Sequence, residues 1–299
     1  MKTTLPERSF VIKPLLDQIT PEILTAGKNT IAMIILFGSY ARGDWVSDEY
    51  TKGHITYSYQ SDLDIMVVLK KGKHIAYAEP RIEKRLEKEL VHDLFSKKPW
   101  ITLIFESINY FNRQLENGRY FYSDIKKEGV LLYDSGEFTL SEAKELSFEQ
   151  RRAIAKDDFE QWFESGSEFL IDALNALQRN SLNRGAFYLH QATESFYSAI
   201  MLVFSGYKIK LHDIRKLGSL AGNYNAELWQ VFPHSSVDQR QAFKLLERAY
   251  IEARYNKEYK ITREQLLFLI ERVNYLQIIT KRICVEYINT YKQLRIIKN

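Results

Sequence analysis

Short apolar runs and stretches of helical period alternate along the first half of the chain. Residues 31–37 are continuously apolar between two glycines, and residues 62–69 alternate between apolar and polar side chains. A continuous run predicts a strand covered on both faces, and alternation predicts a strand with two different faces. Residues 100–105 and 128–136 predict two further strands by the same reasoning.

The segment 79–95 has the spacing of a helix, because its apolar residues recur every four positions. These residues are Ile82, Leu86, Leu90 and Leu94. Residues 45–60 alternate in the period of a strand and predict a hairpin that turns at Lys52-Gly53, which would either decorate the sheet or shape an acceptor pocket. Strands mixed with helices predict a mixed sheet with flanking helices in this half of the chain.

The second half of the chain has helical periods and little strand signal. Two apolar stripes mark long helices, at residues 187–204 and 264–285. The stripes consist of Leu189, Ala192, Phe196, Ala199 and Val203 in the first and of Leu266, Ile270, Val273, Leu276 and Ile283 in the second. An up-and-down bundle of four or five helices is the economical interpretation. The chain is therefore predicted to be α+β, with a first domain at residues 1–138 and a helical domain at residues 139–299.

Composition narrows the class of protein further. The chain has 299 residues, 45% of them hydrophobic, and a formal net charge of +4. This composition is typical of a globular protein, and so weak a positive charge disfavours nucleic acid as a partner. Cys284 lies in an apolar helical pattern and is expected in the core. Because it is the single cysteine, an internal disulfide framework and a cysteine-based zinc site are both excluded. Neither a signal peptide nor a membrane-spanning run is evident, so we expect a cytoplasmic protein without membrane contact.

A small turn follows the first strand and is a candidate phosphate site. Its residues are Gly38, Ser39, Arg42 and Gly43. Small residues at a strand end let an anion approach free backbone N–H groups, the serine adds a hydroxyl, and the arginine adds a positive charge. Arg42 also has a second interpretation, as the partner of Asp44 or Asp48 that braces the segment 45–60.

A pair of carboxylates lies on the next predicted strand. Asp62 and Asp64 are two residues apart, so both side chains emerge on one face of that strand. Two ionised carboxylates side by side repel each other, and a divalent cation between them removes that cost. Mg²⁺ is typically bound by one or two carboxylates together with the phosphates of a substrate. The turn and the pair together therefore predict a site for a nucleoside triphosphate with Mg²⁺ or Mn²⁺.

These motifs resemble the Gly-Ser…Asp-x-Asp signature of the DNA polymerase β-like nucleotidyltransferase superfamily. The likeness is nearest to its minimal and kanamycin-nucleotidyltransferase-like members, and it covers about residues 1–135. It implies a metal-dependent transfer of a nucleoside monophosphate from an NTP to an acceptor, with release of pyrophosphate. Under this resemblance Gly38, Ser39 and their neighbours would hold the phosphates, and Asp62 and Asp64 would bind the metal.

The resemblance also implies a third catalytic carboxylate on the following strand. Glu106 is the only acid there, and it lies at the strand's end, whereas Thr102 occupies the more central position that aligns with the family's acid. Glu106 is therefore our candidate for a third catalytic acid beside Asp62 and Asp64. If Thr102 is the true equivalent, the site lacks the acid that would help to bind a second metal and act as general base toward the acceptor.

The second half of the chain resembles a HEPN domain, a helical bundle found in prokaryotes and higher eukaryotes. The likeness rests on residues 186–222, with their His-Gln-Ala-x-Glu segment and the following "HDIRKL", and on "YIEARYNKEY" at residues 250–259. Ribonuclease members carry an Arg–His pair in the latter position. Here no histidine follows Arg254, and Tyr259 stands in its place. A phenol with a pKa near 10 is a poor general base, so ribonuclease activity is disfavoured.

Smaller features of this half have two interpretations each. Arg254 and its neighbouring tyrosines either line a nucleotide- or substrate-binding groove or form a helix-end aromatic cluster. His190 and Glu194 lie one helical turn apart. They either form a polar pair that faces an active site or make an inter-helix hydrogen bond. Asp213 is expected to cap the helix that follows it.

The leading hypothesis is a Mg²⁺-dependent nucleotidyltransferase acting on a hydroxylated small molecule or a protein side chain. In toxin–antitoxin pairs of the two families, the transferase modifies a tyrosine of the helical partner. By that analogy Tyr259 is a candidate self-target. The alternative is a catalytically weak, nucleotide-binding regulatory module. Bundles of this kind often pair, so a homodimer through the helical domain is a further expectation by analogy.

Overall fold

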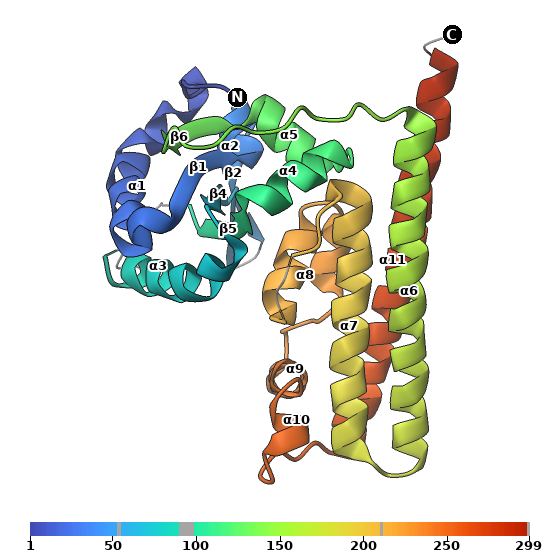
Figure 1. Ribbon diagram of the computed structural model, residues 1–299. Helices are drawn as coiled ribbons and strands as arrows, with labels where there is room; N and C mark the ends of the chain where they lie inside the picture. The colour runs from blue at the N-terminus through green and yellow to red at the C-terminus, as the bar shows by residue number, and fades with distance from the viewer. Residues whose placement is uncertain (53–54, 90–98, 210–211, 298–299) are drawn as a thin grey trace. The chain divides into compact units, whose positions relative to one another are not determined.

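The computed structural model describes residues 1–52, 55–89, 99–209 and 212–297, with side chains except at 48–52, 55–60 and 292–297. The chain divides into two compact units, Met1–Glu145 and Leu146–Asn299. The first unit is built on a sheet, and the second consists of helices (Figure 1). The predicted α+β class is confirmed.

The sheet of the first unit has four strands in the order β5-β4-β1-β6. They are β1 (Ile31–Phe37), β4 (Leu63–Leu69), β5 (Ile101–Ser107) and β6 (Val130–Asp134). Strand β1 pairs antiparallel with β4 and β6, whereas β4 and β5 are parallel, so the sheet is mixed as predicted. Because β1 and β4 run in opposite directions, the carboxyl end of β1 meets the amino ends of β4 and β5. The turn at Gly38-Ser39 and the pair of Asp62 and Asp64 lie at that end of the sheet, whereas Glu106 lies near the other end of β5.

Helices cover both faces of the sheet, which explains why β1 is apolar throughout. Helices α1 (Lys13–Gly27) and α3 (Ile75–Glu89) share one core with the odd-numbered residues of β4. Helices α4 (Ile108–Glu116) and α5 (Tyr120–Glu128) contact strands of the same sheet and bury Phe111 and Tyr122. Short 3₁₀ helices complete the unit at Glu7–Ile12, Lys28–Thr30 and Gly72–His74.

Two local predictions in this unit are confirmed as far as the described residues extend. Helix α3 begins at Ile75, four residues before the predicted start at residue 79, and it buries Ile82 and Leu86 as predicted. Leu90 and Leu94 lie outside the described residues. The predicted hairpin is confirmed as β2 (Ser47–Lys52) paired antiparallel with β3 (Ile55–Gln60), while Gly53 of its predicted turn also lies outside the described residues.

The second unit packs its helices around α7 (Leu182–Ser205). Every residue of α7 from Ala192 to Val203 is buried, because α6, α8, α9, α10 and α11 all contact this helix. The long helices of the described part of the chain are α6 (Phe148–Gln178), α7 and α11 (Arg263–Ile297). The shorter ones are α8 (Ile214–Gly222), α9 (Val237–Arg248) and α10 (Glu252–Tyr255), with a 3₁₀ turn at Ala226–Gln230. The helical bundle is therefore confirmed, with helices of very unequal length.

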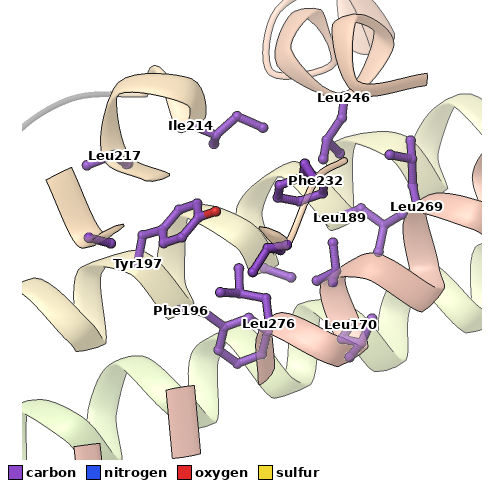
Figure 2. Close-up of a cluster of buried hydrophobic side chains, with 14 of the residues drawn as sticks. Leu170, Leu189, Phe196, Tyr197, Ile214, Leu217, Phe232, Leu246, Leu269 and Leu276 are labelled. Atoms are coloured by element: carbon purple, nitrogen blue, oxygen red, sulfur yellow. The ribbon is translucent and has the colours of Figure 1, made fainter. Parts of the chain in front are cut away.

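The core of this unit draws on every one of its long helices. Figure 2 shows Leu170, Leu189, Phe196 and Leu276 meeting within it, and Cys284 is fully buried as predicted. Both predicted stripes are confirmed, except that Ile270 is only partly buried. Asp213 caps α8 as predicted, accepting hydrogen bonds from the backbone N–H groups of Arg215 and Lys216 at 3.0 Å.

Candidate functional site

The turn after β1 is held in a conformation that requires glycine. Gly38 has a φ of +73° and begins the five-residue helix α2 (Gly38–Arg42), which ends at Gly43 with a φ of +89°. The carbonyl of Ser39 accepts hydrogen bonds from the N–H groups of Gly43 at 2.8 Å and Asp44 at 3.1 Å. The chain therefore changes direction at Gly38 and again at Gly43. Ser39 lies at the start of the helix and is partly exposed.

Gly38 and Asp64 are in direct contact across the sheet. Phe37 pairs with Asp64 in the antiparallel register of β1 and β4. A Cβ atom added to Gly38 would lie 2.3 Å from Asp64 Oδ2, closer than any side chain tolerates. The absence of a side chain at position 38 thus brings the main chain of the turn against a carboxylate. The predicted phosphate turn and the predicted carboxylate pair are adjacent.

Asp64 is destabilised in its ionised form. Burial raises the pKa of Asp64 most, and the negative charge of Asp62 raises it further, to about 8. The positive charge of Arg42 opposes this increase. A carboxyl group with such a pKa keeps its proton at neutral pH unless a cation compensates the two negative charges. A divalent cation with two carboxylate ligands, completed by phosphate oxygens and water, fits this donor set.

Arg42 interacts with two acidic side chains. Its Nε donates to Asp44 Oδ2 at 3.0 Å, and its Nη1 lies 4.0 Å from Glu128 Oε2. Of the two interpretations of Arg42, the geometry favours the pair with Asp44, and the side chain of Asp48 lies outside the described residues. The Arg42 side chain remains 44% exposed, and its charge still acts on Asp64.

The structure separates Glu106 from the aspartate pair. Strands β4 and β5 are parallel, with Asp64 opposite Thr102 and Val68 opposite Glu106. Four residues of a strand span about 13 Å, so Glu106 is at the other end of β5 from the candidate site. Its carboxylate accepts a hydrogen bond from the buried Tyr122 hydroxyl at 3.3 Å.

Thr102 occupies the place beside the pair. Its Oγ1 lies 3.5 Å from Asp62 Oδ2 and its side chain is buried. Within the described ranges, no three His, Cys, Asp or Glu side chains form a group that could hold a metal ion. The assignment of Glu106 as a third catalytic acid stays a prediction, and its position does not favour it.

The second unit contains a relay of polar side chains that joins three segments. His212 Nδ1 lies 3.0 Å from Oε2 of Glu194 on α7, and His212 Nε2 lies 3.2 Å from the hydroxyl of Tyr250. The rings of His212 and Tyr250 are stacked with centroids 4.2 Å apart. Because a carboxylate only accepts, Nδ1 carries the proton that faces Glu194. The members of this relay are distant in the chain, so the sequence around His212 indicates only the start of a helix.

His190 of the same helix takes a different partner. Its Nδ1–H donates to the carbonyl of Leu246 on α9 at 2.9 Å, which is the inter-helix hydrogen bond among the two interpretations above. His190 is fully buried. Burial lowers the pKa of His190, against the opposing effects of hydrogen bonding to the backbone of Leu246 and His212 and of the Glu194 charge.

The aromatic residues near Arg254 form a cage around its guanidinium group. Arg254 Cζ lies 4.9 Å from the ring centre of Phe187 and 4.8 Å from those of Tyr250 and Tyr255. Tyr259 differs from these aromatic residues because it is buried, with 1% of its surface exposed. Its hydroxyl donates to the carbonyl of Leu245 at 2.9 Å. Burial also raises the pKa of Tyr259.

Comparison with known proteins places a family domain in the helical unit. Residues 159–282 match the model of the HEPN domain family. This range begins within α6 and ends within α11, so the bundle of the second unit contains a HEPN domain, as the sequence resemblance implied. No curated protein matches the chain.

Two solved structures show weaker likenesses. One is TT1696 from Thermus thermophilus, with 18% identity, covering 42% of this chain and 97% of its own, at a TM-score of 0.31. Another is a nucleotidyltransferase-like protein from Exiguobacterium sibiricum 255-15, with 10% identity, covering 91% of this chain and 78% of its own, also at 0.31. Likenesses at this TM-score define neither fold nor activity. Separately, no helix in the described ranges is long and apolar enough to cross a bilayer.

Proposed function

We propose that the first unit is a metal-dependent nucleotidyltransferase that moves a nucleoside monophosphate from an NTP to a hydroxyl acceptor. The contact between Gly38 and Asp64 carries this proposal. It sets the Gly38-Ser39 turn directly beside the carboxylate of Asp64, and Asp62 lies two residues before Asp64 in the chain. Such a juxtaposition suits a triphosphate and its cation better than it suits a solvated strand end, where Asp64 would be free of burial.

Each residue of the site has a role under this proposal. Backbone N–H groups of the turn and the Ser39 hydroxyl would bind phosphate oxygens and orient the triphosphate. Asp62 and Asp64 would hold Mg²⁺ or Mn²⁺, which when bound neutralises charge on the transferred phosphoryl group and the leaving pyrophosphate. Arg42, held by Asp44, would add a fixed positive charge at the rim of the site.

A second candidate function follows from the strand register. Thr102 stands opposite Asp64, and Glu106 lies about 13 Å along the strand, so no third acid adjoins the pair among the described residues. A site with two carboxylates can bind nucleotide and metal while lacking a general base for the acceptor. A nucleotide-binding regulatory module with weak turnover is therefore the alternative.

The acceptor is a hydroxylated small molecule or a protein side chain. Among the chain's own phenols, Tyr259 is poorly suited, since it is buried and its hydroxyl is already bonded to Leu245. Tyr250 is better suited, since its hydroxyl meets the Nε2 of a histidine that Glu194 orients. This arrangement supplies a base for the phenolic proton.

The test measures transfer and binding in the same samples. The full-length protein is incubated with α-labelled NTPs, Mg²⁺ or Mn²⁺ and candidate acceptors, while pyrophosphate release and nucleotide binding are followed. The expected result is metal-dependent transfer that is lost in Asp62→Asn/Asp64→Asn but kept in Asp17→Asn, an exposed carboxylate paired with Lys13. Binding without pyrophosphate release would favour the regulatory alternative, and transfer that survives the double substitution would exclude this site.

A further inference from the structure

Helix α2 depends on contacts from outside itself. It has five residues, Gly38–Arg42, so its last carbonyl groups have no partner within the helix. A helix of this length is also far too short to be stable alone. The N–H groups of Gly43 and Asp44 satisfy the carbonyl of Ser39. The carbonyls of Tyr40 and Ala41 require donors from elsewhere in the chain.

The N-terminal segment, residues 2–9, supplies both donors. Ser9 Oγ donates to the carbonyl of Tyr40 at 2.7 Å, and Lys2 Nζ donates to the carbonyl of Ala41 at 3.0 Å. Ser9 is fully buried, so its hydroxyl is shielded from competing water. These two side chains cap consecutive carbonyls of the helix that begins at the phosphate turn.

The same segment packs against the exit of the turn. The ring of Trp45 stacks on Tyr40 at 5.1 Å, and the guanidinium of Arg8 lies 5.0 Å from the centre of the Trp45 ring. Trp45 Nε1 donates to the carbonyl of Arg8 at 3.2 Å. A Cβ atom on Gly43 would lie 3.0 Å from Pro6, so the segment is in contact with the second glycine of the turn.

The segment is itself anchored to the sheet. The N–H of Lys2 donates to the carbonyl of Gly129, and the carbonyl of Lys2 accepts from the N–H of Leu131, both at 2.9 Å. Lys2 thus forms a bridge with Val130 of β6, and Figure 1 shows the start of the chain beside β6 and α2. One residue therefore connects the backbone of an edge strand with the end of α2.

We propose that residues 2–9 are a positioning element of the nucleotide site, in which Ser9 and Lys2 set the orientation of the turn at Gly38-Ser39. This inference rests on the proposed function. Neither side chain touches the substrate. They fix the carboxyl end of α2, and because the helix has only five residues, fixing that end also fixes the direction of its first N–H groups. The element therefore controls affinity for the phosphates of the NTP.

The experiment compares Ser9→Ala, Lys2→Ala and the double variant with two matched controls. Thr25→Ala removes a similar hydroxyl–carbonyl hydrogen bond within α1, and Lys13→Ala removes an exposed lysine. Loss of one cap is expected to raise KM for the NTP about 3- to 10-fold, with a smaller change in kcat. Lys2→Arg, which keeps a donor, should restore most of the affinity, and the controls should leave KM unchanged.

A second measurement is independent of nucleotide. Hydrogen exchange of the Gly43 and Asp44 amides, which bond to Ser39, should accelerate in the double variant while amides of β1 keep their protection. Wild-type protein that neither binds nor transfers nucleotide would refute the proposed function, and faster exchange would then still support positioning of the turn. Unchanged exchange, or faster exchange with unchanged KM in an active enzyme, would overturn the inference. Lys2→Ala alone decides the matter if the buried Ser9→Ala does not fold.

Discussion

The main chain of Gly38 lies against the carboxylate of Asp64, so closely that a Cβ atom at position 38 would fall 2.3 Å from Asp64 Oδ2. This contact joins two features that the sequence places on separate segments. It follows from the antiparallel pairing of β1 and β4, in which Phe37 is opposite Asp64. Any change at Gly38 therefore acts on the carboxylate pair as well as on the turn.

Gly38→Ala is predicted to abolish metal-dependent nucleotide binding. The substitution has two costs, a φ of +73° that disfavours a side chain by about 1–2 kcal/mol and a collision with Asp64. Gly136→Ala is the matched control, because Gly136 has the same φ of +73° and nothing within 4 Å of its added Cβ. Thermal unfolding and binding of a fluorescent NTP should show that both variants lose stability but only Gly38→Ala loses binding. Equal binding by the two variants would mean that the contact is irrelevant to ligand affinity.

Thr102→Asp is predicted to strengthen metal binding and to increase transfer. Residue 102 is opposite Asp64, the place where the resemblance implies a third acid, and Thr102 Oγ1 is 3.5 Å from Asp62. A third carboxylate there should lower the melting temperature of the metal-free protein by repulsion, and Mn²⁺ should restore it. Calorimetric titration with Mn²⁺ and the rate of pyrophosphate release measure the two effects. The neutral isostere Thr102→Asn should show neither, and a gain in Thr102→Asn would refute the role of charge.

The strands of the first unit could be predicted where an apolar run or an alternation of apolar and polar residues indicates them. The apolar run at residues 31–37 coincides with β1, because glycines bound it and both its faces are covered. Helix α4 also has a signal in the sequence that the prediction of strands passed over, since its buried residues Ile108, Phe111 and Leu115 have the i, i+3, i+7 spacing of one helix face. Ser107, which caps the helix, marks its start.

The candidate site could be predicted only in its parts. The residue types of the turn and of the aspartate pair indicate phosphate and a cation, but their contact depends on strand register. Register likewise decides that Thr102, and not Glu106, is opposite Asp64. The partners of His212 could not be inferred, because side chains far apart in sequence meet only after the helices pack.

His190 is predicted to make the helical unit sensitive to acid. Burial lowers the pKa of His190 below its ordinary value of 6.5, so the unfolded chain binds a proton more readily than the folded one. The free energy of unfolding should therefore decrease as the pH falls below 6.5, and this contribution should be constant at higher pH. Urea unfolding between about pH 5 and 8 should show a smaller decrease for His190→Gln than for the wild type. His234, whose pKa burial also lowers, is the comparison, and a decrease removed by His234→Gln alone would contradict the assignment.

Self-transfer, under the proposed function, is predicted to label Tyr250 and not Tyr259. In this step the phenol oxygen forms a bond with the α-phosphorus of the NTP, pyrophosphate leaves, and the phenolic proton passes to His212 Nε2. The contact between His212 Nδ1 and Glu194 holds the imidazole beside Tyr250, with Nε2 3.2 Å from the phenolic oxygen. Tyr259 offers no comparable base, and its hydroxyl would first have to break its hydrogen bond with Leu245.

Peptide mass spectrometry of the protein after incubation with NTP and metal locates the label. Tyr250→Phe should remove it and Tyr259→Phe should keep it, although the latter loses about 1 kcal/mol of stability with its buried hydrogen bond. His212→Gln should slow labelling without preventing nucleotide binding, because it removes the base and leaves Asp62 and Asp64 intact. A label on Tyr259, or one that persists in Tyr250→Phe, would show that the relay of Glu194, His212 and Tyr250 serves another purpose.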